Sequence, residues 1–207
     1  MPDWPQSPAV ARLFQRADQW FQQGRAAVHD QLPCRQGCSH CCHGTFAVTV
    51  LDHMHIQRGM ALLPPITREE IATRARAQTS SMETAFPRLT RSGYIDDWAD
   101  EELDHLVTRF SYLPCPALDQ NGSCLIYAHR PMTCRMMGLP VEREGLVEGA
   151  CDVQTSVPLI RISDIVRREE TELAKKEAAL IAEWHTNADQ TGEELLLPYG
   201  FIDEPVA

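Results

Sequence analysis

Four of the eight cysteines in this chain lie within nine consecutive positions, a spacing that favours metal binding. In chain order the eight are Cys34, Cys38, Cys41, Cys42, Cys115, Cys124, Cys134 and Cys151. Thiolates bind zinc and iron well, and a turn with two or three intervening residues lets two thiolates converge on one ion. We therefore predict that all eight cysteines are ligands of zinc or iron.

The adjacent pair Cys41 and Cys42 bears on the number of metal centres. Neighbouring side chains point to opposite sides of a strand and diverge by about 100° on a helix, so the two thiols should not easily face one ion. They should serve two centres, or one of them is not a ligand. Two four-thiolate sites and one thiolate-bridged cluster both fit eight sulfurs. In either arrangement we expect cysteines of the downstream group to bind the same metal ions as those of the upstream group.

Charge and compartment limit the partners. The net charge of −10 argues against nucleic acid and anionic membranes, which both require a basic surface. Residues 1–18 lack the basic and apolar regions of a secretion signal, and no stretch approaches the roughly 18 apolar residues of a membrane span. We expect a cytoplasmic protein with reduced cysteines, in which metal is favoured over disulfides. A protein partner or substrate stays open.

Apolar periodicity and capping signals predict a mostly α fold with a small β-hairpin, in which helices pack around a cysteine-rich, loop-dominated metal centre. Thr67 and Glu70 have the form of a capping box, and Asn121-Gly122 is typical of a tight hairpin turn. The expected helices span residues 7–30, 52–62, 67–85, 96–110 and 163–185, with a short helical turn over 131–137.

The other segments complete the predicted organisation. We expect a strand over 45–51, the hairpin over 115–127, and a glycine-punctuated loop over 138–151. The tail 195–202 is too apolar to extend into water, so it either packs back or meets a partner. Since the length suits one core, we predict a single domain over 1–207, with the cysteine-cluster core at 32–152.

The second half carries its own motif, Cys124-x-Ile-Tyr-x2-Arg-Pro-x2-Cys134-Arg. Together with the cluster at 34–42, it resembles the bacterial CxxCxxCC family of zinc- or iron-chelating domains, over residues 32–152. The resemblance implies a cysteine-bound metal centre, without an assigned activity for most members. A flagellin lysine methylase looks related through the same cluster. This sequence has Ser39 after Cys38, where the family often has glycine, and its flanking helices fall outside the resemblance.

Three further residues near the second cysteine group are candidate cofactor-binding residues. Arg130 and Arg135 flank Cys134, and guanidinium groups that donate to sulfur offset the negative charge of a thiolate centre. Tyr127 is a candidate donor to the same centre. The alternatives are surface ion pairs for the arginines and a core position for the tyrosine. His40 and His43 could replace a thiolate, but eight sulfurs suffice without them.

Three functions follow from a metal centre of this kind. The protein could be a zinc-braced interaction module, an iron-sulfur enzyme with redox or methyl-transfer activity on another protein, or a metal store. The spacing of Cys34, Cys38 and Cys41 matches that of radical enzymes that cleave S-adenosylmethionine. Those enzymes need an iron with an open position, whereas Cys42 offers an additional ligand. Their barrel of alternating strands and helices is also not visible in this mostly helical pattern. No hydrolytic or nucleotide-binding motif occurs. We predict a metal-binding protein whose catalytic residues, if it is an enzyme, cannot be assigned from sequence.

Overall fold

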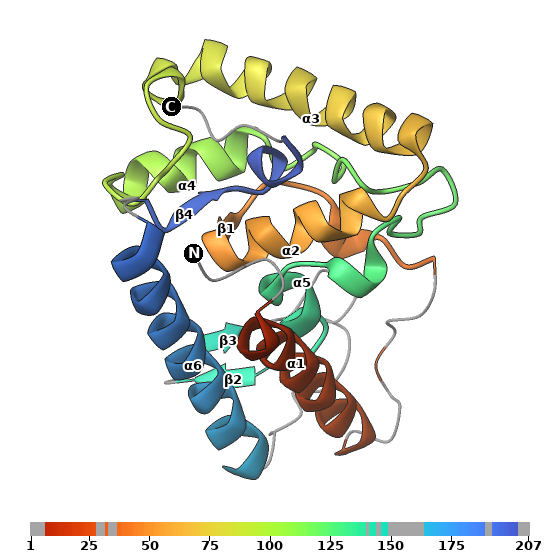
Figure 1. Ribbon diagram of the computed structural model, residues 1–207, viewed down its shortest axis with the longest axis vertical. Helices are drawn as coiled ribbons and strands as arrows, with labels where there is room; N and C mark the ends of the chain where they lie inside the picture. Colours follow the sequence, from red (N-terminus) through yellow and green to blue (C-terminus); the bar gives the residue numbers. More distant parts are fainter. Residues whose placement is uncertain are drawn as a thin grey trace. The chain divides into compact units, whose positions relative to one another are not determined.

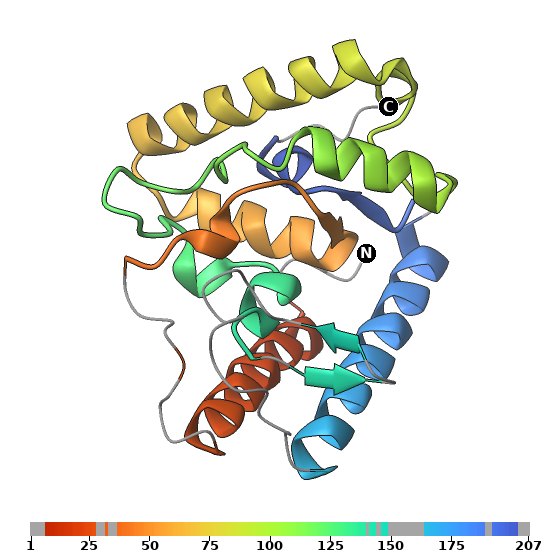
Figure 2. The same ribbon diagram turned by 180° about the vertical axis from the view of Figure 1, so that it is seen from behind.

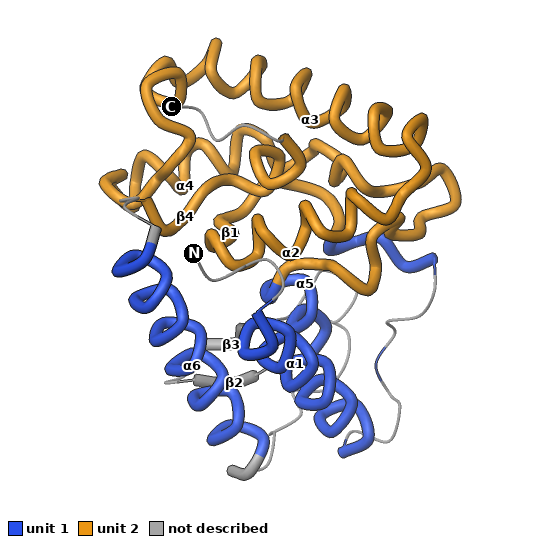
Figure 3. Tube along the Cα trace, in the orientation of Figure 1, with its two compact units in different colours: residues 1–41, 132–189 blue, residues 42–131, 190–207 orange. Residues whose placement is uncertain are grey.

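The computed structural model describes residues 7–27, 32, 37–139, 141–143, 146–148, 164–188 and 192–202. The chain divides into two compact units (Figure 3): unit 1 contains residues 1–41 and 132–189, and unit 2 contains residues 42–131 and 190–207. Six α-helices dominate the described residues, and the predicted class, mostly α with a small β-hairpin, is confirmed. The single domain over 1–207 stays a prediction.

Unit 1 is built on two long helices, α1 (Pro8–Ala27) and α6 (Asp164–Ala188), which lie side by side (Figure 1), and on the short α5 (Met132–Met136). The apolar face of α1 is buried, and the Trp20 indole Nε1 donates to the Val166 carbonyl of α6 at 2.7 Å. Burial of this face explains why the 3.6-residue period located both long helices. Asp30 and Ser163, at the predicted outer ends, lie outside the described residues.

The β-hairpin of unit 1 was not expected from the sequence. Strands β2 (Val141–Arg143) and β3 (Leu146–Glu148) pair antiparallel, with Val141 opposite Glu148. We predicted a loop over 138–151, and that prediction is wrong for these residues. Three residues a strand are too few for alternating hydrophobicity to stand out in the sequence.

Unit 2 begins with strand β1 (Ala47–Thr49), which leads directly into helix α2 (Val50–Ala61). The strand lies within the predicted segment 45–51, but the helix starts two residues before the predicted 52. The reason is a capping box: the Thr49 hydroxyl accepts from the Asp52 amide, and the Asp52 carboxylate accepts from the Thr49 amide. This reciprocal pair fixes the strand-to-helix junction.

Two helix starts in unit 2 differ from prediction. Helix α3 (Pro65–Ala85) begins before Thr67 without a side-chain cap, so the predicted capping box is wrong; Pro65 suits the first helical position because it has no amide hydrogen to satisfy. Helix α4 (Asp100–Arg109) begins four residues after the predicted 96. There the Asp96 carboxylate accepts instead from the amides of Glu193 and Glu194, at 2.9 and 3.2 Å.

The apolar tail packs back onto unit 2, as one of the two expected outcomes. Strand β4 (Glu194–Leu196) pairs antiparallel with β1, and the 3-10 helix η5 (Leu197–Phe201) packs against α2 and α3 (Figures 1 and 2). All five residues of η5 are buried, and the Tyr199 hydroxyl donates to Glu83 Oε1 at 3.0 Å. The last described segment is therefore part of the core of unit 2.

The predicted turn at Asn121-Gly122 is present, within a less regular hairpin than expected. The Asp119 amide donates to the Ser123 carbonyl at 2.9 Å, and Gly122 has a φ of +76°. Leu118 and Cys124 form an isolated antiparallel bridge. Within the described chain, none of the helices combines the length and the apolarity that a membrane span requires.

We expect Gly59→Ala to destabilise unit 2. A Cβ at position 59 would lie 2.6 Å from the Cβ of His129, near the rigid backbone of that residue. Overpacking of this kind costs about 1–3 kcal/mol, which should exceed the gain of up to about 1 kcal/mol from replacing glycine in a helix. Urea unfolding measures the difference, with the exposed neighbour Arg58→Ala as the control. A Gly59→Ala protein as stable as wild type would contradict the close packing.

Candidate metal centre

The upstream and downstream cysteine segments of unit 2 run alongside each other. The Cys115 amide donates to the Cys42 carbonyl at 2.7 Å, and the Gly44 amide donates to the Leu113 carbonyl at 2.7 Å. Gly44 has a φ of +89°, and a Cβ there would lie 3.4 Å from the Ser111 carbonyl oxygen. Glycine permits both this conformation and this close approach. Backbone hydrogen bonds therefore bring together two cysteines that are 73 positions apart.

Cys115 begins a turn whose backbone supports a thiolate. Hydrogen bonds from the backbones of Ala117 and Leu118 stabilise the charged form of its sulfur. Burial acts in the opposite direction and dominates, so that the pKa of the Cys115 thiol rises to about 12, with the charge of nearby Cys124 also raising it. The metal-free thiol is therefore neutral at pH 7, and a bound cation would reverse this, since a coordinating thiol is deprotonated.

The donor chemistry of this turn fits zinc or iron. Both metals accept thiolate sulfur, and amide hydrogen bonds to that sulfur are the outer-sphere support that such ligands use. Among the residues that the structure describes, no group of three or more cysteine, histidine or carboxylate side chains is close enough to hold an ion. Cys34 and Cys151, two of the predicted ligands, lie outside that part of the chain.

The other predicted ligands divide between the units. Cys38, Cys41 and Cys134 belong to unit 1, and Cys42, Cys115 and Cys124 belong to unit 2. All six are partly buried thiols, with no disulfide between any two of them. The boundary between the units falls between the adjacent residues Cys41 and Cys42.

Tyr127 and Arg130 interact with each other in unit 2. The Arg130 guanidinium lies 4.1 Å from the centre of the Tyr127 ring and donates to the Tyr127 carbonyl at 2.9 Å. Tyr127 is 64% exposed, so it is not a core residue. A cation over an exposed aromatic face contributes about 0.5–1 kcal/mol. Their role in cofactor binding stays a prediction.

Arg135 lies buried within unit 1, one residue after Cys134 on α5. Its guanidinium forms an ion pair with the Asp18 carboxylate of α1 and lies 5.2 Å from the centre of the Phe14 ring. The side chain is only 2% exposed. The arginine thus fastens α5, which carries Cys134, to α1, and any contribution to cofactor binding stays a prediction.

We expect Asp18→Asn to destabilise unit 1 by about 1–2 kcal/mol, because a buried guanidinium loses its charged acceptor while Asp18 itself keeps partial access to water. Chemical unfolding measures the change. Glu169→Gln, in the more exposed ion pair between Arg16 and Glu169, is the matched control and should cost less than about 1 kcal/mol. Equal effects of the two substitutions would contradict a special role for the buried pair.

Arg74 of α3 was not among the residues predicted from the sequence. Its guanidinium donates to the Leu118 carbonyl at 2.8 Å, and its charge lowers the pKa of the Cys115 thiol, against the larger effect of burial. The residue is 41 positions upstream of Cys115 and has no cysteine near it in sequence. Only the packing of α3 against the Cys115 turn reveals it.

A family model matches this chain. The sequence model of a family described as "CxxCxxCC: Putative zinc- or iron-chelating domain" matches residues 33–152, more than half of the chain. Searches of curated proteins and of solved structures gave no significant match. The matched range includes the four clustered cysteines and the four downstream ones.

Proposed function

Because the chain belongs to the CxxCxxCC family of zinc- or iron-chelating domains, we propose that it is a metal-binding protein whose eight cysteines coordinate zinc or iron. The ligands are those predicted from spacing, Cys34, Cys38, Cys41, Cys42, Cys115, Cys124, Cys134 and Cys151. We further propose a cytoplasmic location, where thiols stay reduced and available to metal.

One observation carries this proposal beyond family membership. The Cys115 amide donates to the Cys42 carbonyl at 2.7 Å, and the Gly44 amide donates to the Leu113 carbonyl at 2.7 Å, so two cysteine segments far apart in the sequence lie together. A centre that shares ligands from both segments requires their cysteines to come together in this way. This arrangement supports a role for Cys42 and Cys115 as ligands of the same or adjoining centres.

The metal itself can be identified by anaerobic purification, elemental analysis and an absorption spectrum. Thiolate sites accept both zinc and iron, so donor type does not choose between them. Colourless protein with stoichiometric zinc would support a structural centre. Iron with acid-labile sulfide and a visible absorption band would support an iron-sulfur cluster. Protein that binds neither metal would contradict the proposed function.

Cys42→Ala tests the assignment of both adjacent cysteines. If Cys41 and Cys42 serve different centres, removing Cys42 should lower the metal content of the purified protein, because one centre loses a ligand. Elemental analysis per polypeptide measures this. Tyr112→Ala, at an exposed position of the same unit, is the control, and its metal content should equal that of wild type. Unchanged metal in Cys42→Ala would remove Cys42 from the ligand set.

A further inference from the structure

Two side chains on one face of α3 hold the turn that starts at Cys115. Arg74 Nη1 donates to the Leu118 carbonyl at 2.8 Å, and Gln78 Nε2 donates to the Pro114 carbonyl at 2.8 Å. Arg74 and Gln78 are four residues apart, so they share a face of the helix. The two carbonyls lie on either side of Cys115 along the chain. Helix α3 therefore braces this turn at both ends.

We propose that Arg74 is a positioning residue for the metal centre: it holds the Cys115 turn in place and supplies the positive charge that a thiolate ligand requires. The inference rests on the proposed function, because it assumes that Cys115 binds the metal. It assigns to α3, which contains no cysteine, a defined part in metal binding.

Charge is the first argument for this role. A zinc ion with four thiolates carries a net negative charge, and a nearby guanidinium lowers the free energy of that state. Arg74 donates to the Leu118 carbonyl, so its positive charge lies at the turn that carries the Cys115 sulfur. Arg74 is partly buried, so its charge is less screened than that of a fully exposed arginine.

Geometry is the second argument. The guanidinium is a planar fork, and Arg74 Nε also lies 3.4 Å from the Glu70 carbonyl one turn earlier in α3. Because Arg74 contacts both α3 and the Cys115 turn, it fixes the distance between the helix and the turn. Lysine keeps the charge but offers a single flexible ammonium, so it cannot reproduce both contacts.

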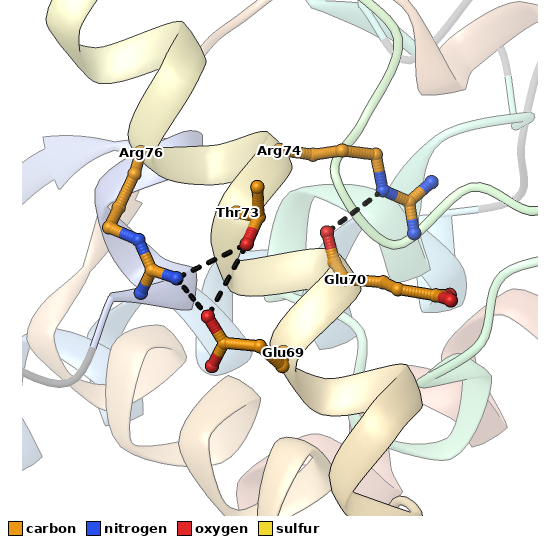
Figure 4. A network of polar contacts seen from close by, with 5 residues as sticks. All are labelled: Glu69, Glu70, Thr73, Arg74 and Arg76. Carbon is orange, nitrogen blue, oxygen red and sulfur yellow. Dashed lines mark hydrogen bonds and ion pairs between the residues drawn. The ribbon is translucent and has the colours of Figure 1, made fainter.

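Arg76 provides a matched contrast on the same helix. Figure 4 shows the Arg74 and Arg76 side chains leaving α3 in different directions. Arg76 forms an ion pair with Glu69 and donates to Thr73 Oγ1 at 3.2 Å, both within α3, and it is exposed. Its removal changes the charge of the helix by the same amount as removal of Arg74 without touching the Cys115 turn.

The test is a zinc titration of the full chain in competition with a chromophoric chelator. Removal of an outer-sphere partner typically weakens metal binding 10–100-fold, so we expect Arg74→Gln to raise the Kd for zinc by about tenfold or more. Arg74→Lys should recover part of this loss through its charge, and Arg76→Gln should match wild type. Gln78→Leu, which keeps the charge of Arg74, separates positioning from electrostatics and should weaken binding less than Arg74→Gln.

Hydrogen exchange of the metal-free proteins supplies a second readout. Amides of residues 117–125 should exchange faster in Arg74→Gln than in wild type or Arg76→Gln, because the turn loses its brace. If wild type binds zinc and Arg74→Gln has the same Kd for zinc and the same amide exchange over residues 117–125, the inference is overturned. A wild type without affinity for zinc or iron would instead overturn the proposed function, whichever residue occupies position 74.

Discussion

Replacing Cys115 by serine should abolish stable metal binding. The Cys115 amide donates to the Cys42 carbonyl at 2.7 Å, which places Cys115 beside the upstream cysteine segment. A serine hydroxyl is not deprotonated at neutral pH and is a poor ligand for zinc or iron. Since outer-sphere changes alone weaken metal binding 10–100-fold, loss of the ligand should exceed about a hundredfold. Chelator competition with zinc measures the Kd.

Ser123→Ala is the matched control for this substitution. Ser123 lies in the same hairpin, where its backbone, and not its hydroxyl, accepts and donates the hydrogen bonds with Asp119. The control should therefore bind zinc as wild type does. Circular dichroism of the metal-free proteins checks that Cys115→Ser keeps its helices. A folded Cys115→Ser protein with wild-type affinity would remove Cys115 from the ligand set.

The features that the sequence predicted well are those that repeat or stand out in composition. The long helices α1 and α6 were located because their buried faces recur every three or four residues over several turns. The turn at Gly122 was located because few residues adopt a positive φ. The family was recognised from two cysteine motifs whose combination is specific, and the match over 33–152 confirms it.

The features that the sequence did not predict depend on contacts between distant segments. Helix α4 starts later than predicted because the Asp96 carboxylate accepts from amides almost a hundred positions away. No local feature of the sequence indicates such a partner. For the same reason Arg74 was overlooked in favour of Arg130 and Arg135, which are close to Cys134 in sequence. Proximity along the chain is a poor guide to the cation beside a buried thiol when a separate helix supplies it.

The adjacent pair Cys41 and Cys42 bears on the number of metal centres. Adjacent side chains diverge, so the two thiols should not easily face one ion. If the two thiols serve different centres, Cys42→Ala should lose metal from one centre and keep the other.

We expect Phe201→Ala to have the largest effect on the stability of unit 2. Phe201 is 2% exposed in η5, and Gln57 of α2 donates to the flanking carbonyls of Gly200 and Ile202 at 2.9 and 3.2 Å. Truncation of a buried phenylalanine typically costs about 3–5 kcal/mol, from lost apolar burial and the cavity left behind. Urea unfolding followed by circular dichroism measures this loss.

The loss of stability should extend to the segment that contains Cys42 and Gly44. Helix η5 follows directly on β4, β4 pairs with β1, and β1 begins shortly after that segment in the sequence. Amides of residues 47–49 should therefore exchange faster in Phe201→Ala, and zinc affinity should fall with them. Tyr112→Ala, which removes an aromatic ring that is 67% exposed in the same unit, is the matched control and should change the free energy of unfolding by less than about 0.5 kcal/mol. If Phe201→Ala and Tyr112→Ala both changed the free energy of unfolding by the same small amount, the tail would not contribute to the stability of unit 2. The positions of the cysteine segments would then not depend on it.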